Sequence, residues 1–288
     1  MREVFAKSHI ERLYFSGLGN SCEVDILRDD LIHPLVSGNK WRKLKYIVDY
    51  MQRAGKQKLV TFGGAYSNHL VAAAYAGRTF GIETHAFVRG NENRAPNAFE
   101  KLCMQNGMNL IHVDRAAYRD KNQLFNSKFQ NDPLAEMVGE GGRHPMALPG
   151  CAEILTELHQ EYDLIVLSLG TGTTMEGLLK AVSEKKLKTR ILGISSLKNN
   201  LELDRIMSAY PRKYWQVEHN YHRGKYARND SELNDFIHLF HTETGIRLEF
   251  VYTGKMMMAL CEMLKNGQIA AGQKILCIHT GGLPDLLQ

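Results

Sequence analysis

The sequence predicts an α/β fold made of open, twisted, mainly parallel sheets with helices on their faces. Short apolar runs with the length of buried strands recur along the chain, and helical segments stand between them. This alternation is typical of parallel sheets, because parallel neighbours need a long crossover that is usually a helix. The predicted strands cover residues 58–62, 83–88, 109–113, 162–169, 190–196 and 274–280.

The predicted strands fall into two groups, and a chain of 288 residues can form two unequal lobes. Residues 45–155 resemble a βαβαβ unit and are expected to form the smaller lobe. Residues 1–44 and 156–288 are expected to form the larger lobe, into which the smaller one is inserted.

Three further segments carry element predictions. A helix is expected over residues 152–162, leading into the second group of strands. Residues 116–143 are polar and end in a glycine-rich run, so they are expected to be a surface excursion. The methionine-rich segment 255–267 has apolar residues at helical spacing and is expected to be a core helix that stops at Asn266 and Gly267.

The composition excludes several classes of protein. Hydrophobic residues make up 44% and charged residues 23%, so the chain is not largely disordered. Charges interrupt the apolar runs of the first 15 residues, and no stretch approaches the ~18 apolar residues of a membrane span, so we expect a cytoplasmic protein without a membrane partner. The five cysteines are scattered and never at CxxC spacing, which argues against a disulfide framework or a zinc ribbon, and no metal is expected.

The net charge of +5 is mild and favours small anionic ligands. Residues 210–230 interleave cations with aromatic side chains, as sites for single-stranded nucleic acid do. Glu218 and Asp230 interrupt this stretch and no nucleic-acid-binding motif frames it, so we expect no nucleic-acid partner.

A buried strand runs directly into the sequence GTGTT, which precedes a helix. Glycines let the backbone approach an anion, and the hydroxyls and the free N–H groups at the helix start supply donors, so this junction is expected to be a phosphate cup. A dinucleotide site would need glycine at Met175, and a Walker loop would need a lysine beside the hydroxyl. A tight turn without a ligand is the alternative. The cup consists of Gly170, Thr171, Gly172, Thr173 and Thr174.

Two other junctions have a functional and a structural interpretation. Gly63 and Gly64 end a predicted strand, and Ser67 or Asn68 is suited to cap the helix that follows. That helix start could also hold a carboxylate. Residues 37–46 contain four cations, which fit a solvated helix face, a grip on an anion, or a reactive lysine.

Six motifs in this order resemble the pyridoxal-phosphate enzymes grouped as 1-aminocyclopropane-1-carboxylate deaminase and D-cysteine desulfhydrase. They are LRDDLIHPLVSGNKWRKLKY, GGAYSNH, GTGTT, GKYARND, VYTGK and HTGG, and they span nearly the whole chain. The resemblance implies a tryptophan-synthase-β-like fold (pyridoxal-phosphate fold type II), a large cofactor domain, a small substrate-side domain with the site between them, and a homodimer.

The resemblance also implies roles for individual residues. Lys40 would form the covalent bond with pyridoxal 5'-phosphate, and Lys43 would help the GTGTT loop to hold the phosphate. Asn68 would contact the ring hydroxyl, and Ser67, Asn68 and His69 would bind the substrate carboxylate. The remaining site residues would be Tyr226 and Tyr252 as catalytic tyrosines and Thr253 and Thr280 against the cofactor ring.

Simple chemistry agrees with a reactive Lys40. A catalytic lysine must be neutral for part of the time, and neighbouring cations lower the pKa of its amine. Lys43 would be the close neighbour, whereas Arg42 and Lys45 are expected on the outer helix face, because all three cannot point inward.

Two departures bear on the substrate. In the deaminase the position of Thr253 is a glutamate that faces the pyridine nitrogen, and the position of Thr280 is a leucine. A threonine offers only a neutral hydrogen bond and gives a weaker electron sink. The expected function is therefore a lyase of the D-cysteine desulfhydrase kind, which converts a small amino acid to pyruvate, hydrogen sulfide and ammonia, with Lys40 or Ser67 as the base. The alternatives are the cyclopropane deaminase and a cofactor-binding protein without turnover.

Overall fold

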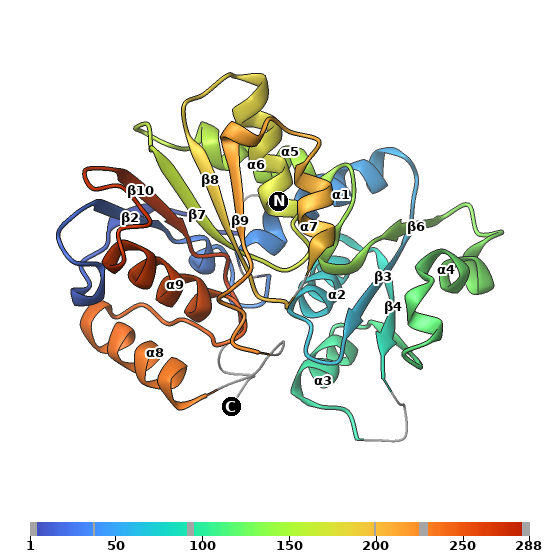
Figure 1. Ribbon diagram of the computed structural model, residues 1–288. Helices are drawn as coiled ribbons and strands as arrows, with labels where there is room; N and C mark the ends of the chain where they lie inside the picture. The colour runs from blue at the N-terminus through green and yellow to red at the C-terminus, as the bar shows by residue number, and fades with distance from the viewer. Residues whose placement is uncertain (1–4, 37, 91–94, 199, 225–229, 284–288) are drawn as a thin grey trace.

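The computed structural model describes residues 5–36, 38–90, 95–198, 200–224 and 230–283. The strands form one sheet of six and one of four, in the orders β1-β2-β10-β7-β8-β9 and β5-β4-β3-β6. Only the pair β1 and β2 is antiparallel in the ladders of the described residues. The predicted α/β class with two mainly parallel sheets is confirmed (Figure 1).

All six predicted strands are present. The strands are β1 (Ile10–Arg12), β2 (Glu23–Leu27), β3 (Lys58–Gly64), β4 (Glu83–Arg89), β5 (Asn109–Val113), β6 (Ala135–Val138), β7 (Leu164–Leu169), β8 (Arg190–Ser195), β9 (Trp215–Glu218) and β10 (Lys274–Ile278).

Four strands were not predicted, namely β1, β2, β6 and β9. Three of them have three or four residues, and β2 carries Asp25 in its centre, so none shows a long apolar run. The expectation that residues 116–143 are only a surface excursion is wrong, because β6 pairs with β3 inside the four-stranded sheet.

The helices are α1 (Asn39–Arg53), α2 (Asn68–Phe80), α3 (Ala98–Gln105), α4 (Lys121–Phe129), α5 (Ala147–Ala152), α6 (Thr173–Glu184), α7 (Leu201–Met207), α8 (Ser231–Thr244) and α9 (Thr253–Lys265). The predicted helix over residues 152–162 is wrong. The chain instead forms α5 and a 3-10 turn, Glu153–Thr156. The carboxylates of Glu153 and Glu157 bind cations of α1, which draws this segment toward that helix.

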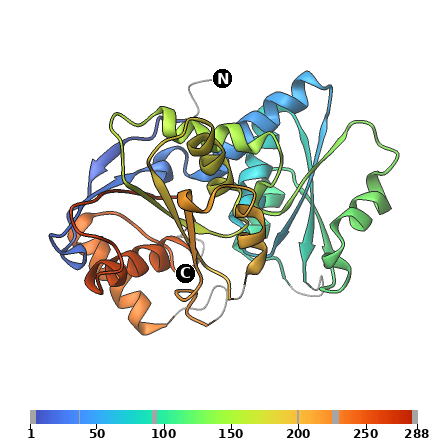
Figure 2. The ribbon, with the colours of Figure 1, turned by 45° about the horizontal axis from the view of Figure 1, so that its top comes forward.

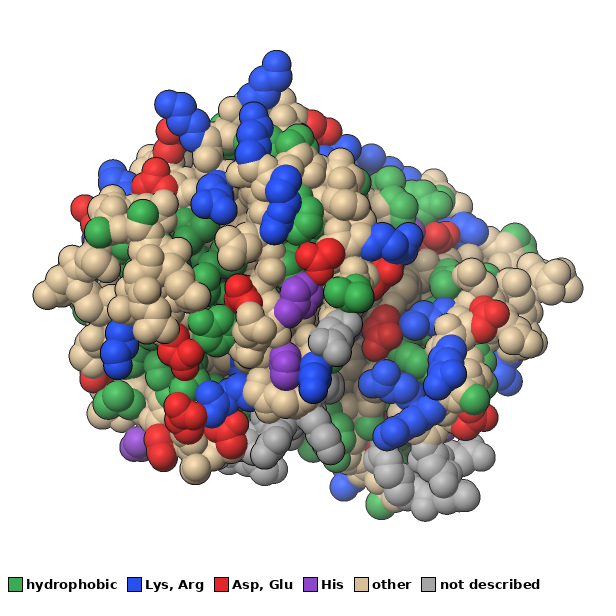
Figure 3. Space-filling view, in the orientation of Figure 1, with side chains coloured by type: hydrophobic (Ala, Val, Ile, Leu, Met, Phe, Trp, Pro, Cys, Tyr) green, Lys and Arg blue, Asp and Glu red, His purple; other side chains and the backbone are tan. Residues whose placement is uncertain are grey.

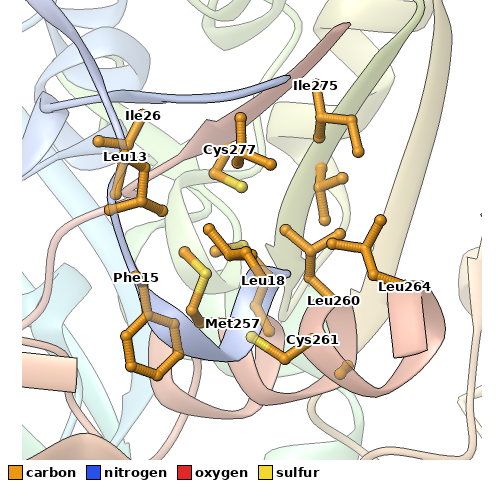
Figure 4. Packing of buried hydrophobic residues seen from close by; sticks show 14 of the residues in the cluster. Leu13, Phe15, Leu18, Ile26, Met257, Leu260, Cys261, Leu264, Ile275 and Cys277 are labelled. Atoms are coloured by element: carbon orange, nitrogen blue, oxygen red, sulfur yellow. The ribbon is translucent and has the colours of Figure 1, made fainter. Parts of the chain in front are cut away.

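The six-stranded sheet is buried on both faces. Along β7, Leu164 and Val166 face the cluster of α8 and α9, whereas Ile165 and Leu167 face the cluster of α6 and α7. The methionine-rich helix α9 packs Met257, Leu260 and Leu264 on this sheet (Figure 4). The prediction that this segment is a core helix is confirmed.

The four-stranded sheet has its own two clusters. Residues of α1, α2 and α3 cover one face, and Tyr118 and Phe129 cover the other. Because its strands lie between residues 58 and 138, this sheet forms a separate lobe beside the larger one (Figure 2). We propose the division into 1–44 with 156–288 and 45–155, with α1 crossing the first boundary. Within the described residues, no helix has the length and apolar character needed to span a membrane.

Candidate active site

A cavity of about 2230 Å³ lies between the lobes and is lined by both of them. Its walls follow the carboxyl ends of β3, β4, β7 and β10, where ligands of open α/β sheets bind. The predicted site residues that line it are Lys40, Lys43, Ser67, Asn68, His69, Gly170, Thr171, Gly172, Thr173, Thr174, Tyr252 and Thr280. Tyr226 lies outside the described residues.

Lys40 is the second residue of α1, and its side chain is only partly exposed. Its amine donates a hydrogen bond of 2.7 Å to Oδ1 of Asn39. Burial, and after it the charge of Lys43, lower the pKa of the Lys40 amine to about 7. Around neutral pH a large fraction of this amine is therefore unprotonated and nucleophilic.

Asn39 connects Lys40 to the glycine-threonine loop. Its side-chain nitrogen donates a hydrogen bond of 2.9 Å to Oγ1 of Thr174. Lys40 and this loop, which lie about 130 residues apart in sequence, are thus joined by two consecutive hydrogen bonds.

The glycine-threonine loop leads into α6 through Gly172, which has the left-handed φ of 81°. The first intrahelical hydrogen bond runs from the N–H of Glu176 to the carbonyl of Gly172. The amides of the first turn before Glu176 are therefore free of intrahelical partners and face the end of the helix where an anion is favoured.

The buried amine of Lys43 enters the same cavity from α1. It donates a hydrogen bond of 3.1 Å to the carbonyl of Gly141, and burial lowers its pKa. This contact brings the Gly139–Arg143 loop, which was expected on the surface, to the wall of the cleft.

The other two cations of residues 37–46, Arg42 and Lys45, do not line the cavity. Lys45 forms an ion pair with Glu153 and is partly exposed. The prediction that Arg42 lies on the outer helix face is wrong, because its guanidinium is 3% exposed and binds Asp29. A buried carboxylate needs a charge partner, and the sequence does not reveal that Asp29 is buried.

Ser67, Asn68 and His69 form the start of α2. The prediction that Ser67 caps this helix is confirmed, since its Oγ accepts a hydrogen bond from the N–H of Leu70. Oδ1 of Asn68 and Nδ1 of His69 are buried and have no hydrogen-bond partner among the described residues. Such orphaned polar atoms are costly unless a ligand satisfies them.

The hydrogen bonds of Thr61 define the tautomer of His69. The Thr61 hydroxyl has a single hydrogen, which it donates to the carbonyl of Val138 at 2.7 Å. It must therefore accept from Nε2 of His69, 2.8 Å away. Burial and the charges of Lys40 and Lys43 lower the pKa of His69 to about 3, so the ring is neutral and Nδ1 presents a lone pair.

Tyr252 and Thr280 lie on the large-lobe wall. The ring of Tyr252 lies beside Gly170, where an added Cβ would be 3.4 Å from the tyrosine oxygen. The hydroxyls of Thr280 and Ser168 are 3.0 Å apart. Thr253 does not line the cavity, because it is fully buried and its Oγ1 accepts a hydrogen bond of 3.0 Å from the N–H of Glu249.

Sequence reasoning missed several residues that line the cavity, among them Asn39, Ser168 and the Gly139–Arg143 loop. Asn39 directly precedes Lys40 in the sequence, and Ser168 lies two residues before the GTGTT loop. Their position next to predicted site residues was the sequence signal that could have identified them. For the Gly139–Arg143 loop, the only sequence signal was its glycine-rich composition.

A family model described as "Pyridoxal-phosphate dependent enzyme" matches residues 15–281. The chain belongs to this family. The resemblance stated from the six motifs is thereby confirmed, and so are the enzyme class and the pyridoxal-phosphate cofactor.

The relatives of this pyridoxal-phosphate enzyme carry two activities in their names. The bifunctional D-cysteine desulfhydrase/1-aminocyclopropane-1-carboxylate deaminase, mitochondrial, of Arabidopsis thaliana is 27% identical over 307 residues, which cover 95% of this chain and 76% of that protein. The D-cysteine desulfhydrase of Serratia proteamaculans (strain 568) is 25% identical over 298 residues, which cover 92% and 88%. A solved structure described as an ACC deaminase homologue has a TM-score of 0.83 and 25% identity, and the match covers 98% of this chain and 91% of that one.

The residues of the cleft fit this cofactor. The free amides at the start of α6 and the amine of Lys43 are suited to the phosphate, and the amine of Lys40 is suited to the aldehyde. The orphaned Oδ1 of Asn68 can accept a hydrogen bond from the ring hydroxyl. When bound, the cofactor supplies an electron sink for the bonds broken at the substrate α-carbon.

Proposed function

We propose that this pyridoxal-phosphate enzyme catalyses an α,β-elimination on a small amino acid, with D-cysteine as the type substrate. The reaction breaks the Cα–H and Cβ–S bonds, and hydrolysis of the released aminoacrylate gives pyruvate, hydrogen sulfide and ammonia. The single observation that carries the proposal is a neutral residue at both departures from the deaminase. Thr253, at the position of the deaminase glutamate, is buried against Glu249, and the hydroxyl of Thr280 lies on the large-lobe wall beside Ser168.

Uncharged hydroxyl groups beside the cofactor ring favour elimination over the opening of a cyclopropane. A hydroxyl cannot hold a pyridine nitrogen in its protonated form as a carboxylate does, so the electron sink is weaker. Expelling a thiolate from the β-carbon needs less stabilisation than opening an unactivated ring. The carboxylate of Glu249 does not alter this, because it accepts hydrogen bonds from the amides of Val251, Tyr252 and Thr253 and does not line the cleft.

The start of α2 is suited to hold the substrate carboxylate. Ser67 keeps its own hydroxyl hydrogen for donation, because its oxygen only accepts from Leu70. The α-proton then passes to Nζ of Lys40, or to Oγ of Ser67 when that oxygen has first given its own hydrogen to the carboxylate; both residues line the cavity. The side chain of His69 is neutral and presents a lone pair at Nδ1, so it cannot donate a hydrogen bond to the carboxylate, and the donor in this place is the Ser67 hydroxyl.

The test is an assay of 2-oxo acid release by the cofactor-loaded enzyme. D-cysteine, L-cysteine and 1-aminocyclopropane-1-carboxylate are compared at equal concentration. We expect pyruvate and hydrogen sulfide from a cysteine enantiomer and little 2-oxobutanoate from the cyclopropane. Efficient 2-oxobutanoate release would overturn the proposal, and so would a loaded protein without any turnover. A homodimer stays a prediction, which light scattering can check.

A further inference from the structure

Three arginines of the smaller lobe line the cleft without a carboxylate partner. Arg89, Arg115 and Arg119 are all exposed, and none forms an ion pair within the part of the chain that the structure describes. Figure 3 shows Lys and Arg side chains gathered on this lobe beside the hollow between the lobes. The cofactor chemistry above does not use these three residues.

The fold brings the three arginines to one edge of the small sheet. Arg89 is the last residue of β4, Arg115 follows the parallel neighbour β5, and Arg119 ends the 3-10 turn after it. The Arg89 guanidinium lies over the ring of Tyr118, 5.4 Å from its centroid. Its Nη2 would be 3.6 Å from a Cβ at Gly64, the last residue of β3, after which the chain leads to Ser67. This edge therefore adjoins the start of α2.

Among the described residues, four acidic side chains line the cleft and none of them forms an ion pair with the three arginines, although Glu140 lies beside Tyr118 and Asp120 follows Arg119. Each of them is engaged elsewhere: Asp120 caps α4 through Gln123, Glu140 binds Lys121 at 3.5 Å, Glu176 binds Arg143 at 3.6 Å and Glu202 binds Arg205 at 2.6 Å. The phosphate of the cofactor would be the counter-charge for Lys43. The three guanidiniums thus form a positively charged wall whose members have no ion-pair partner among the described residues.

The cleft also has room beyond the cofactor. Its volume of about 2230 Å³ exceeds the ~300–1,000 Å³ that is typical of small-molecule sites. A substrate held by its α-carboxylate at Ser67 can therefore extend its side chain toward Arg89. Guanidiniums bind sulfonate, phosphate and carboxylate groups through two parallel hydrogen bonds.

We propose that the wall formed by Arg89, Arg115 and Arg119 binds a second anionic group on the substrate side chain. The preferred substrate is then an amino acid whose β-substituent carries a negative charge. This inference rests on the proposed elimination and narrows its substrate class. With S-sulfocysteine the same Cα–H and Cβ–S bonds break, thiosulfate leaves with the bonding electron pair, and water converts the aminoacrylate to pyruvate and ammonia.

The experiment compares substrates that differ in charge but share the bond that breaks. Pyruvate release by the cofactor-loaded enzyme is measured with cysteine and with S-sulfocysteine, each as both enantiomers. The variant carries Arg89→Gln, Arg115→Gln and Arg119→Gln, and Arg78→Gln is the control, because Arg78 is an exposed arginine of α2 that does not line the cleft.

We expect the wild-type KM for S-sulfocysteine to be at least about tenfold below that for cysteine, because charge-assisted hydrogen bonds contribute on this scale. The triple variant should lose this preference and keep its KM for cysteine, and added salt should weaken the preference in the wild type only. Equal KM values for the two substrates in the wild type would overturn the inference. An equal rise of KM for both substrates in the triple variant would also overturn it, because the arginines would then act on the shared α-carboxylate or on the folding of the lobe.

A failure of the elimination itself gives a different result. If neither substrate yields pyruvate, the proposed function fails, and the wall is then tested by calorimetric titration of the loaded protein with the two amino acids. Tighter binding of S-sulfocysteine that disappears in the triple variant would still support the anion site. Equal affinities would reject it.

Discussion

The side-chain amide of Asn39 lies between the amine of Lys40 and the hydroxyl of Thr174, accepting from the lysine at 2.7 Å and donating to the threonine at 2.9 Å. The buried side chain of Asn39 thus fixes the position of the Lys40 amine relative to the loop that is suited to the cofactor phosphate. Asn39 and Lys40 belong to α1 and Thr174 belongs to α6, so these hydrogen bonds also connect the starts of the two helices.

Asn39→Ala should weaken cofactor binding. The substitution leaves the Lys40 amine and the Thr174 hydroxyl without their buried partner, a loss of about 1–3 kcal/mol, which corresponds to a Kd roughly tenfold higher. Fluorescence titration of the apo-enzyme with pyridoxal phosphate measures it. Unchanged affinity would show that Asn39 does not position these groups.

Lys40→Ala should abolish turnover and the visible absorbance of the lysine-bound cofactor, because no other amine replaces the covalent bond. Borohydride reduction of the wild type should leave the cofactor mass on the peptide that contains Lys40. Lys45→Ala is the matched control on the same helix, since its amine pairs with Glu153 outside the cleft. Cofactor found on another lysine would refute the assignment.

The reaction of the apo-enzyme with pyridoxal should depend on pH with a midpoint near 7. The pKa of the Lys40 amine is lowered to about 7, first by burial and then by Lys43. Below this value the amine is protonated and unreactive, so the rate rises as the pH rises through 7 and then levels off.

Two variants isolate the cause of this shift. Lys43→Met removes a positive neighbour, so the pKa of Lys40 and the midpoint should both move upward, whereas Lys45→Met should leave the midpoint in place. Pyridoxal lacks the phosphate, so a lost phosphate contact does not affect the comparison. Stopped-flow absorbance gives the rates, and an identical midpoint in all three proteins would contradict the electrostatic account.

The elements with strong local patterns could be predicted from sequence. The buried strands β7 and β10 have continuous apolar runs, and α9 repeats its methionines at helical spacing. The short strand β6 and the buried Arg42 could not be predicted, because their partners, β3 and Asp29, lie outside the local segment whose pattern was analysed. Local patterns indicate the type of an element but not what it pairs with.

The same distinction holds for the site. Ser67 and the GTGTT loop carry signals in their own residue types, since capping and glycine-rich turns are local chemistry. Thr253 and Thr280 were both predicted to lie against the cofactor ring. The register of α9 instead places Thr253 against Glu249 and leaves Thr280 at the cleft wall.

Arg42→Ala should destabilise the protein strongly. It would leave Asp29, which is 0% exposed, without its charge partner, a loss of about 3–5 kcal/mol. Arg53→Ala on the same helix is the control, because its pair with Asp49 is largely exposed and contributes less than about 1 kcal/mol. Urea unfolding measures both. Replacing the buried pair together, with Arg42→Met and Asp29→Leu, should recover part of the loss, and equal effects of the two alanine variants would contradict the argument.

Gly38→Ala should damage both stability and cofactor binding. Gly38 precedes α1 with a φ of 62°, and a Cβ there would lie 2.0 Å from the carbonyl oxygen of Thr280. Gly55→Ala is a matched control, because Gly55 has a φ of 67° and nothing lies within 4 Å of its Cβ position. Both variants bear the cost of a left-handed backbone, about 1–2 kcal/mol. Only Gly38→Ala must also displace the Thr280 loop from Lys40, so only this variant should lose affinity for pyridoxal phosphate in the fluorescence titration. Equal cofactor affinities in the two variants would show that the contact between Gly38 and Thr280 does not shape the site.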